Sequence, residues 1–373
     1  MILPAAPWMD PARPVAAALE DAGHCALLVG GCVRNALMGR AVTDLDLATD
    51  AHPGTVIARA EVAGLKVVPT GLAHGTVTVI TGGTPVEVTT FRRDVATDGR
   101  HATVAFAQDV AEDAARRDFT MNALYADLRG RVIDPLGGMD DLRARHVRFV
   151  GDPDRRIAED YLRILRFFRF HAIYGDADAG LDAEGLAACA SGAEGLARLS
   201  RERVGAEMGK LLSAADPAPA VAAMAQAGVL ARVLPGADAT ALPVLVHLEG
   251  DLPPDPIRRL ALLGGEADLR LSKADATRLT RIAAAARDGT APPELAYRHG
   301  AALARDAALV RAALIGTPPA LDGLAEAAAA RFPVTAADLM PALKGPALGH
   351  RLRELEARWI ASGFRLTKDQ LLG

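Results

Sequence analysis

Two aspartates separated by one residue, Asp44 and Asp46, stand inside a short apolar stretch of the chain. On a β-strand, side chains at i and i+2 lie on the same face, so both carboxylates would point in one direction. Neighbouring carboxylates repel each other unless a cation neutralises them, and hard divalent ions prefer such oxygen ligands. The spacing therefore suggests a metal site, while a solvated strand end with two acids would show the same pattern.

A third acid, Glu87, occurs in the alternating stretch VEVTTF. Alternation places Glu87 on the face opposite Val86 and Val88, so a simply exposed side chain is one interpretation. As a third carboxylate beside Asp44 and Asp46, Glu87 would instead complete a catalytic two-metal cluster. The residues alone leave both interpretations open.

Groups that suit a phosphate precede the two aspartates. Gly30 and Gly31 come directly before a helix-length segment, where backbone N–H groups can approach phosphate oxygens. Arg34, one helical turn later, has the geometry to clamp the same oxygens. A Gly-Gly turn is common, so this pattern indicates a phosphate site only in combination with the two aspartates that follow.

A charged segment, RRDFTMN at residues 116–122, enters an expected strand at Ala123. Arg117, Asp118 and Asn122 give this segment a polar face that could hold a triphosphate and a ribose. The capped start of a secondary-structure element is the alternative interpretation.

The strongest distal pattern is residues 159–169, EDYLRILRFFR, in which Asp160, Arg163, Arg166 and Arg169 recur every three residues. Such a row winds slowly around a helix, with Asp160 and Arg163 adjacent. A solvated, salt-bridged face is the simplest explanation. However, most of the other positions are apolar, and arginines on a largely buried helix need a partner, which an anionic ligand would provide.

The elements that must position these residues follow from turn and periodicity signals. The first ~150 residues mix helices with hairpins, which favours an α+β head with a mainly antiparallel sheet over a doubly wound one. Residues 92–117 show no clear period and are expected to form a mobile loop. Helices are expected at 14–22, 34–38 and 53–63, strands at 25–29 and 44–49, and hairpins at 74–80/85–91 and 123–128/131–133.

After residues 151–153 helical periodicity dominates, interrupted by proline and glycine. We therefore expect a head at 1–150 followed by an all-α neck at 151–213, a helical body at 214–290 and a helical tail at 291–373. In the last stretch, basic residues outnumber acids, which suggests contact with a nucleic-acid backbone or an ordinary solvated helix face. These residues are Arg351, Arg353, Arg358, Arg365 and Lys368.

Composition limits the classes of protein. The chain has 373 residues, a formal net charge of −4 and a pI near 6.2, so a non-specific nucleic-acid binder is disfavoured and any such contact should be local. Cys25, Cys32 and Cys189 have no metal-binding spacing and fit a reducing compartment. With no signal-peptide pattern and no apolar run of membrane-spanning length, we expect a cytoplasmic protein without membrane contact.

Taken together, five ordered segments resemble the class II tRNA nucleotidyltransferase family, which includes the CCA-adding enzymes and bacterial poly(A) polymerases. A weaker match continues near the C-terminus in PVTAADLMPALKGPALGHRLRELE, and Asn35 stands where the family more usually has Asp. The five segments are LVGGCVRNALMGRAVTDLDLAT, HGTVTVITGGTPVEVTTFRRD, RRDFTMNALYAD, IDPLGGMDDLRAR and EDYLRILRFFRF.

The resemblance implies a polymerase-beta-type nucleotidyltransferase head, Mg²⁺ as cofactor, and CTP, ATP and the 3′ end of tRNA as partners. It implies that Asp44 and Asp46 bind Mg²⁺, and beside them we expect Glu87 as a further catalytic carboxylate. Contacts with the nucleotide would come from Gly30, Gly31, Arg34, Arg117, Asp118, Asn122, Asp160, Arg163, Arg166 and Arg169. The implied reaction is attack of the RNA 3′-OH on the α-phosphate with release of pyrophosphate.

Base choice can be argued from hydrogen bonding. If Asp160 accepts and Arg163 donates, the pair matches cytosine, with N4–H₂ beside N3, and adenine, with N6–H₂ beside N1. Uracil and guanine present a carbonyl oxygen and an N–H at those places and leave polar groups unpaired. A CCA-adding enzyme is therefore the leading hypothesis. A poly(A) polymerase, a CC-only or A-only enzyme, and a catalytically inactive RNA-binding protein are the alternatives.

Overall fold

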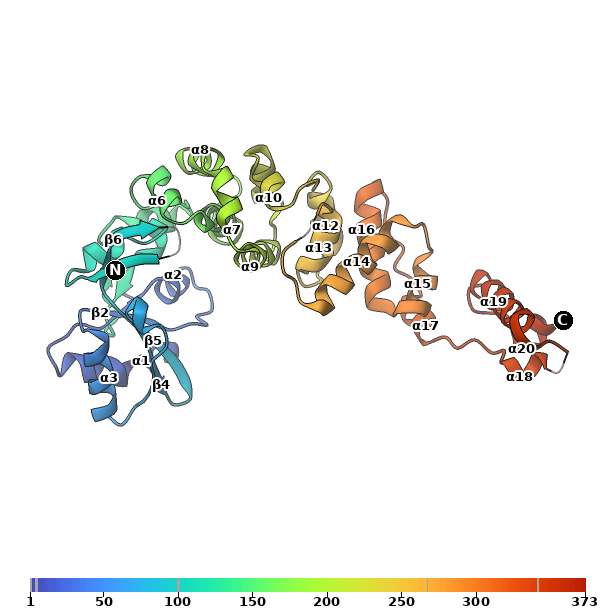
Figure 1. Cartoon of the computed structure of the whole chain (residues 1–373), viewed down its shortest axis with the longest axis horizontal. Helices are drawn as coiled ribbons and strands as arrows, with labels where there is room; N and C mark the ends of the chain where they lie inside the picture. The colour runs from blue at the N-terminus through green and yellow to red at the C-terminus, as the bar shows by residue number, and fades with distance from the viewer. Residues whose placement is uncertain (1, 4–5, 99–100, 267, 341) are drawn as a thin grey trace. The chain divides into compact units, whose positions relative to one another are not determined.

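The computed structural model (Figure 1) describes residues 2–3, 6–98, 101–266, 268–340 and 342–373. The chain forms two compact units. The first comprises Met1–Glu207 and Ala223–Val233, and the second comprises Met208–Ala222 and Leu234–Gly373. The expected head and most of the expected neck fall in the first unit, whereas residues 208–213 of the neck fall in the second. The finer division into head, neck, body and tail stays a prediction.

A seven-stranded sheet in the order β3-β4-β5-β2-β1-β8-β9 forms the centre of the head. Its pairs are antiparallel except for β2 with β5, which are parallel. The expected α+β class with a mainly antiparallel sheet is therefore confirmed. The strands are β1 (Leu27–Val29), β2 (Asp46–Thr49), β3 (Lys66–Val68), β4 (Thr76–Thr81), β5 (Thr84–Thr90), β8 (Tyr125–Ala126) and β9 (Val132–Ile133).

Glycine-containing turns set the register of both expected hairpins. Gly82 and Gly83, with φ of 56° and 85°, join β4 to β5. Positive φ at both central residues gives the type of two-residue turn that matches the twist of paired strands. Gly130, with φ of 86°, lies between β8 and β9. Both hairpins are confirmed, with boundaries within a few residues of those expected.

The expected mobile loop at 92–117 is wrong. Strands β6 (Arg92–Asp98) and β7 (His101–Phe106) pair as a separate antiparallel sheet, and helix α4 (Val110–Ala115) follows. Two strands that pair through backbone hydrogen bonds need no apolar alternation, so the search for a period overlooked them. The β-branched residues Val95, Thr97, Thr103 and Val104 were the available signal.

Helices surround the sheet and continue beyond it. The helix expected at 34–38 begins earlier, at Gly31, because Gly30 adopts φ of 71° and serves as its N-cap. Helices of the first unit include α1 (Ala12–Glu20), α2 (Gly31–Leu37), α3 (Pro53–Val62), α5 (Gly138–Arg143), α6 (Pro153–Glu159), α7 (Leu162–Tyr174), α8 (Ala183–Ser191) and α11 (Val229–Val233), with short 3-10 turns such as η3 (Thr120–Asn122).

An aromatic cluster fixes α7 against the head. Phe119 lies 5.0 Å from Phe149 and 4.7 Å from Phe170, measured between ring centroids, and Phe149 stacks on Phe167 at 5.3 Å. All four rings are buried. Because Phe119 follows Asp118 and the cluster includes two residues of α7, the packing brings Asp118 close to the arginines of that helix.

Helices α9 (Arg201–Leu212) and α10 (Ala218–Gln226) each include residues of both units. The rest of the second unit, as far as it is described, is helical. No helix in the described ranges is both long and apolar enough to cross a membrane. The helices are α12 (Leu242–Glu249), α13 (Pro256–Leu263), α14 (Lys273–Arg287), α15 (Pro292–His299), α16 (Ala301–Ile315), α17 (Leu324–Ala329), α18 (Ala336–Leu339), α19 (Gly345–Ala361) and α20 (Lys368–Leu372).

Candidate active site

The three acids singled out in the sequence lie on or beside neighbouring strands. Asp46 opens β2 and is paired in parallel register with Glu87 of β5, whose backbone N–H donates to the Leu45 carbonyl at 2.9 Å. Asp44 lies before β2, so the expected strand start at Asp44 is wrong by two residues. Asp44 and Glu87 are exposed, whereas Asp46 is partly buried.

The electrostatics of Asp46 favour a cation. Burial raises its pKa to about 6, and repulsion from Glu87 and Asp44 acts in the same direction, while Arg117 opposes it. Within the described residues no group of three His, Cys, Asp or Glu side chains is already arranged around a metal-sized space. The two aspartates thus fit a hard divalent ion by chemistry and charge. Glu87 is a neighbouring charge on a solvent-facing side chain, and its catalytic role stays a prediction.

The turn between β1 and α2 places the glycine pair beside two arginines. A Cβ on Gly30 would lie 3.3 Å from Nη1 of Arg117, and its φ of 71° is a conformation that other residues rarely adopt. The turn therefore brings bare backbone close to the Arg117 guanidinium. One turn into α2, Arg34 is only 5% exposed.

Arg34 is held by neutral partners. Its Nη1 donates to Oδ1 of Asn122 at 2.7 Å, and its Nη2 donates to the Tyr174 hydroxyl at 2.7 Å and to Oδ1 of Asn35 at 2.9 Å. Its guanidinium also lies 3.9 Å from the centre of the Tyr174 ring. Among the described residues no carboxylate bonds to it, so its positive charge remains available to an anion.

Asn35, the residue after Arg34, orients this arginine. It accepts from both Nε and Nη2 of Arg34 and donates to the Ala41 carbonyl at 3.1 Å. The amide therefore keeps the orienting hydrogen bonds while adding no negative charge. Burial accordingly lowers the pKa of Arg34.

Arg117 and Asp118 are adjacent in sequence but belong to different ion pairs. Arg117 donates to the Tyr125 hydroxyl at 3.0 Å and to Asp113 at 2.9 Å. Burial alone would lower the pKa of its guanidinium, but Tyr125 and Asp113 outweigh burial and raise it. The sequence analysis singled out neither Asp113 nor Tyr125. The i, i+4 spacing of Asp113 and Arg117 was a signal for Asp113, whereas Tyr125 is eight residues from Arg117 and had no such signal.

Asp118 instead bonds to α7. Its Oδ2 accepts from both Nε and Nη2 of Arg166, and its Oδ1 accepts from Asn122 at 3.1 Å. Burial alone would raise the pKa of Asp118, but the charge and hydrogen bonds of Arg166 lower it to about 2. Asp118 is therefore ionised at neutral pH. The chain Arg34–Asn122–Asp118–Arg166 connects α2, η3 and α7 in one polar network.

The residues expected to read the base have other partners. Oδ2 of Asp160 accepts from Arg203 at 2.6 Å, and Arg163 donates to Glu159 at 2.5 Å. The Arg163 backbone N–H donates to the Asp160 carbonyl at 2.9 Å, but their side chains share no hydrogen bond. Nothing in the sequence pointed to Arg203, because it lies 43 residues from Asp160.

Arg169 has an internal partner as well. Its Nε donates to Oε2 of Glu207 at 2.5 Å, and both side chains are nearly buried. Glu207 therefore supplies the partner that burial of Arg169 requires, so this burial does not by itself indicate an anionic ligand. A role for Arg169 at the nucleotide site stays a prediction.

Parts of the chain match two family models, and known proteins are similar over longer stretches. Residues 26–148 match the poly A polymerase head domain, and residues 181–240 match the probable RNA and SrmB-binding site of polymerase A. The mitochondrial CCA tRNA nucleotidyltransferase 1 of Mus musculus is 33% identical over 94% of this chain and 86% of its own length. The CCA-adding enzyme of Levilactobacillus brevis is 42% identical over 55% of this chain and 51% of its own length.

A solved structure extends the likeness to the fold. The Bacillus stearothermophilus CCA-adding enzyme in complex with CTP superposes with a TM-score of 0.77 and 29% identity, over 96% of this chain and 94% of that one. The Thermotoga maritima CCA-adding enzyme complexed with tRNA shares the fold at 18% identity and a TM-score of 0.71. Matches of this length and identity, together with the carboxylates beside the Gly30–Gly31 turn, show that the chain belongs to the CCA tRNA nucleotidyltransferase family.

Proposed function

We propose that this nucleotidyltransferase completes the 3′ end of tRNA by adding C, C and A from CTP and ATP. The observation that supports this most is the arrangement at the sheet: Asp46 and Glu87 lie on paired strands, and the turn at Gly30 leads into the helix of Arg34 and lies close to the Arg117 guanidinium. Carboxylates for a divalent ion next to a buried, uncompensated arginine suit a triphosphate whose α-phosphate is attacked.

Each residue group has a role in this proposal. Asp44 and Asp46 would hold Mg²⁺, which when bound would activate the attacking hydroxyl and neutralise charge on the triphosphate. Arg34 and the backbone at Gly31 would hold phosphate oxygens. Arg117 and Asp118, each fixed by its own ion pair, would orient the triphosphate and ribose without rearranging.

The base would be selected by Asp160 and Arg163. Asp160 offers carboxylate oxygens to an exocyclic amino group, and Arg163 offers N–H groups to a ring nitrogen, which fits cytosine and adenine. Arg203 and Glu159 hold these two side chains in position at 2.6 and 2.5 Å before a nucleotide arrives. When a nucleotide binds, Asp160 would accept from both Arg203 and the base, and Arg163 would donate to both Glu159 and the base.

Replacing Asp160 by Ala is expected to reduce the preference for CTP and ATP over UTP and GTP by about 5- to 150-fold, which corresponds to about one to three kcal/mol for an unpaired polar group. Asp160→Asn is the sharper variant, because its amide can donate to the carbonyl oxygen of uracil. The measurement is kcat/KM for each nucleotide on one tRNA. Asp154→Ala, an exposed acid on α6, serves as the control, and an unchanged preference in both Asp160 variants would contradict the assignment.

The function itself is tested by product length. The protein is incubated with Mg²⁺, one nucleotide at a time, and tRNAs that end before, within and after CCA. Stepwise addition that stops at CCA is expected. Long adenosine tails would indicate a poly(A) polymerase, addition of only C or only A would indicate a partial enzyme, and binding without addition would indicate an inactive RNA-binding protein.

The tail was expected to touch the tRNA backbone, and that role stays a proposal. Several of its basic side chains have partners within the chain. Arg351 pairs with Glu354 at 2.8 Å, Lys368 pairs with Asp338 at 2.5 Å, and Arg365 donates to the Ser362 carbonyl at 2.9 Å. These pairs support the alternative of an ordinary solvated helix face. The expected cytoplasmic location also stays a proposal, since relatives include mitochondrial enzymes.

A further inference from the structure

A basic hollow in the second unit lies between the start and middle of α14, the end of α15 and the start of α16. Its volume is about 630 Å³. Four of its lining side chains are basic and none is acidic. In a protein with a net charge of −4, this is a local concentration of positive charge. The hollow is lined by Lys273, Ala274, Thr277, Arg278, Arg281, His299, Ala302 and Leu303.

The basic side chains at the rim are free to bind. Lys273, Arg281 and His299 are exposed. Across the part of the chain that the structure describes, neither Lys273 nor Arg281 pairs with a carboxylate. This distinguishes them from the tail residues Arg351 and Lys368, which have acidic partners.

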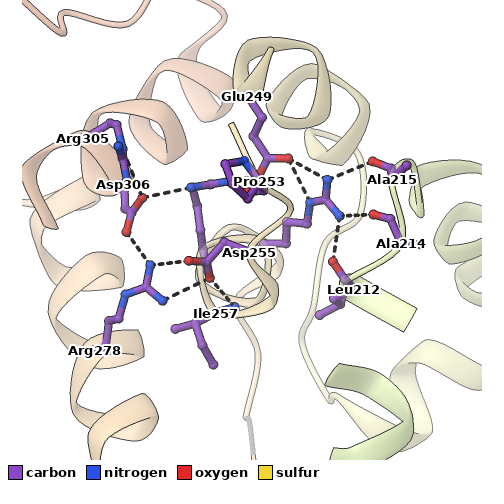
Figure 2. Close-up of polar contacts among 12 residues, drawn as sticks. Leu212, Ala214, Ala215, Glu249, Pro253, Asp255, Ile257, Arg278, Arg305 and Asp306 are labelled. Carbon is purple, nitrogen blue, oxygen red and sulfur yellow. Dashed lines mark hydrogen bonds and ion pairs between the residues drawn. The ribbon is translucent and has the colours of Figure 1, made fainter. Parts of the chain in front are cut away.

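The remaining cation, Arg278, is fixed in place by a buried ion network (Figure 2). Its Nη2 donates to Asp255 and to Asp306, both at 2.5 Å. Asp306 also accepts from Arg258 at 3.0 Å, and Arg258 in turn donates to Glu249 at 2.8 Å. Two carboxylates neutralise Arg278, so it gives the hollow a rigid wall and N–H groups, while Lys273 and Arg281 give it net charge.

The spacing of the charges indicates the kind of partner. Lys273, Thr277 and Arg281 recur every four residues on α14, so successive side chains lie about 6 Å apart along one helix face. The Thr277 hydroxyl donates to the Lys273 carbonyl, so the free charges of the row are Lys273 and Arg281, about 12 Å apart at 1.5 Å per residue. Two cations at that separation suit a polymer with repeated anions better than a single small anion. Apolar side chains in the lining, such as Leu303, offer a contact surface for a sugar between two phosphates.

We propose that this hollow binds the phosphate backbone of the RNA substrate. The proposal rests on the proposed function for its ligand, because the RNA that this family extends is tRNA. It adds residues of α14, which precede the expected tail at 291–373, to the tail contact expected from the sequence. Lys273 and Arg281 would each neutralise one phosphate.

The test is tRNA binding by the full chain without nucleotide, measured by fluorescence anisotropy at several salt concentrations. Lys273→Gln/Arg281→Gln removes two charges and no internal contact. The matched control, Arg59→Gln/Lys66→Gln, removes two charges from exposed residues of α3 and β3 in the head. The first variant is expected to bind tRNA about tenfold more weakly, with the slope of log K against log salt reduced by roughly 1.5 to 2. The control is expected to match the wild type.

Addition of CTP at saturating tRNA separates this proposal from the proposed function. The charge-removed variant should keep the wild-type kcat and show a raised KM for tRNA, because the catalytic residues are untouched. If the wild type adds nucleotides and the variant binds tRNA with unchanged affinity and salt slope, only the proposed role of the hollow would be overturned. If the wild type adds no nucleotide but the variant binds tRNA more weakly than the wild type, the proposed function would be overturned and the role of the hollow supported. An equal loss of affinity in the control would also overturn the proposal, because charge removal anywhere would then suffice.

Discussion

Asp46→Asn is expected to lower kcat for nucleotide addition by at least about a thousandfold, the effect of losing several kcal/mol of charge stabilisation at a metal site. Asp46 is the more buried of the two proposed ligands and lies beside Glu87 on the paired strand. An amide of the same shape keeps an oxygen but removes the charge that attracts a divalent ion. The measurement is single-turnover addition of CMP to a tRNA that lacks CCA, with tRNA binding recorded in parallel.

The fold should survive this change. In the described structure the Asp46 side chain makes no hydrogen bond, so its replacement breaks no internal contact and the unfolding temperature should not fall. Glu61→Gln, at an exposed position of α3, is the control and should retain activity. Retained activity in Asp46→Asn would contradict the metal assignment.

Glu87→Gln, measured in the same assay, decides between the two interpretations of Glu87. Loss of activity comparable to that of Asp46→Asn would make Glu87 a third ligand, and near wild-type activity would make it a solvent-facing neighbour.

Glu249→Ala is expected to destabilise the second unit by about 3 to 5 kcal/mol, the usual effect of removing one partner of a buried ion pair. Glu249 is 4% exposed and bonds both Arg258 and Arg259, which are 2% and 1% exposed. Arg259 donates to it at 2.6 Å and otherwise bonds backbone carbonyls such as that of Leu212 at 2.7 Å. Without Glu249, Arg259 would keep only backbone carbonyls as partners, and Arg258 would depend on Asp306, which Arg278 also uses (Figure 2).

Urea unfolding of the full chain, followed by far-ultraviolet circular dichroism, measures this loss. Glu326→Ala, an exposed acid on α17, provides the control and should change the free energy of unfolding by less than about 0.5 kcal/mol. A loss below about 1 kcal/mol in Glu249→Ala would show that the arginines find other partners or water. The variant leaves the head untouched, so CMP addition at low temperature should persist.

Local signals were sufficient for much of the head. Gly82–Gly83 and Gly130 require positive φ, which defines tight turns whatever surrounds them, and both hairpins follow. The pairing of β2 with β5 could not be predicted this way. Parallel strands need a long connection, and here it includes α3, β3 and β4, so no local turn signal marks the pair. The hairpin of β6 and β7 was missed because paired backbones do not need an apolar pattern.

The sequence by itself determined the α+β class, the carboxylates, the glycine turn with Arg34, and the family through the order of its motifs. These features depend on residue type and on spacing of a few residues, which the chain carries locally. The tertiary structure decided which charges compensate each other. Asp118 bonds Arg166 rather than its neighbour Arg117, Arg203 holds Asp160, and Glu207 neutralises Arg169. It also decided that Lys273 and Arg281 of α14 and His299 of α15 line one hollow. Coulombic and hydrogen-bond partners are set by distances in space, and helices packed from far along the chain fix those distances.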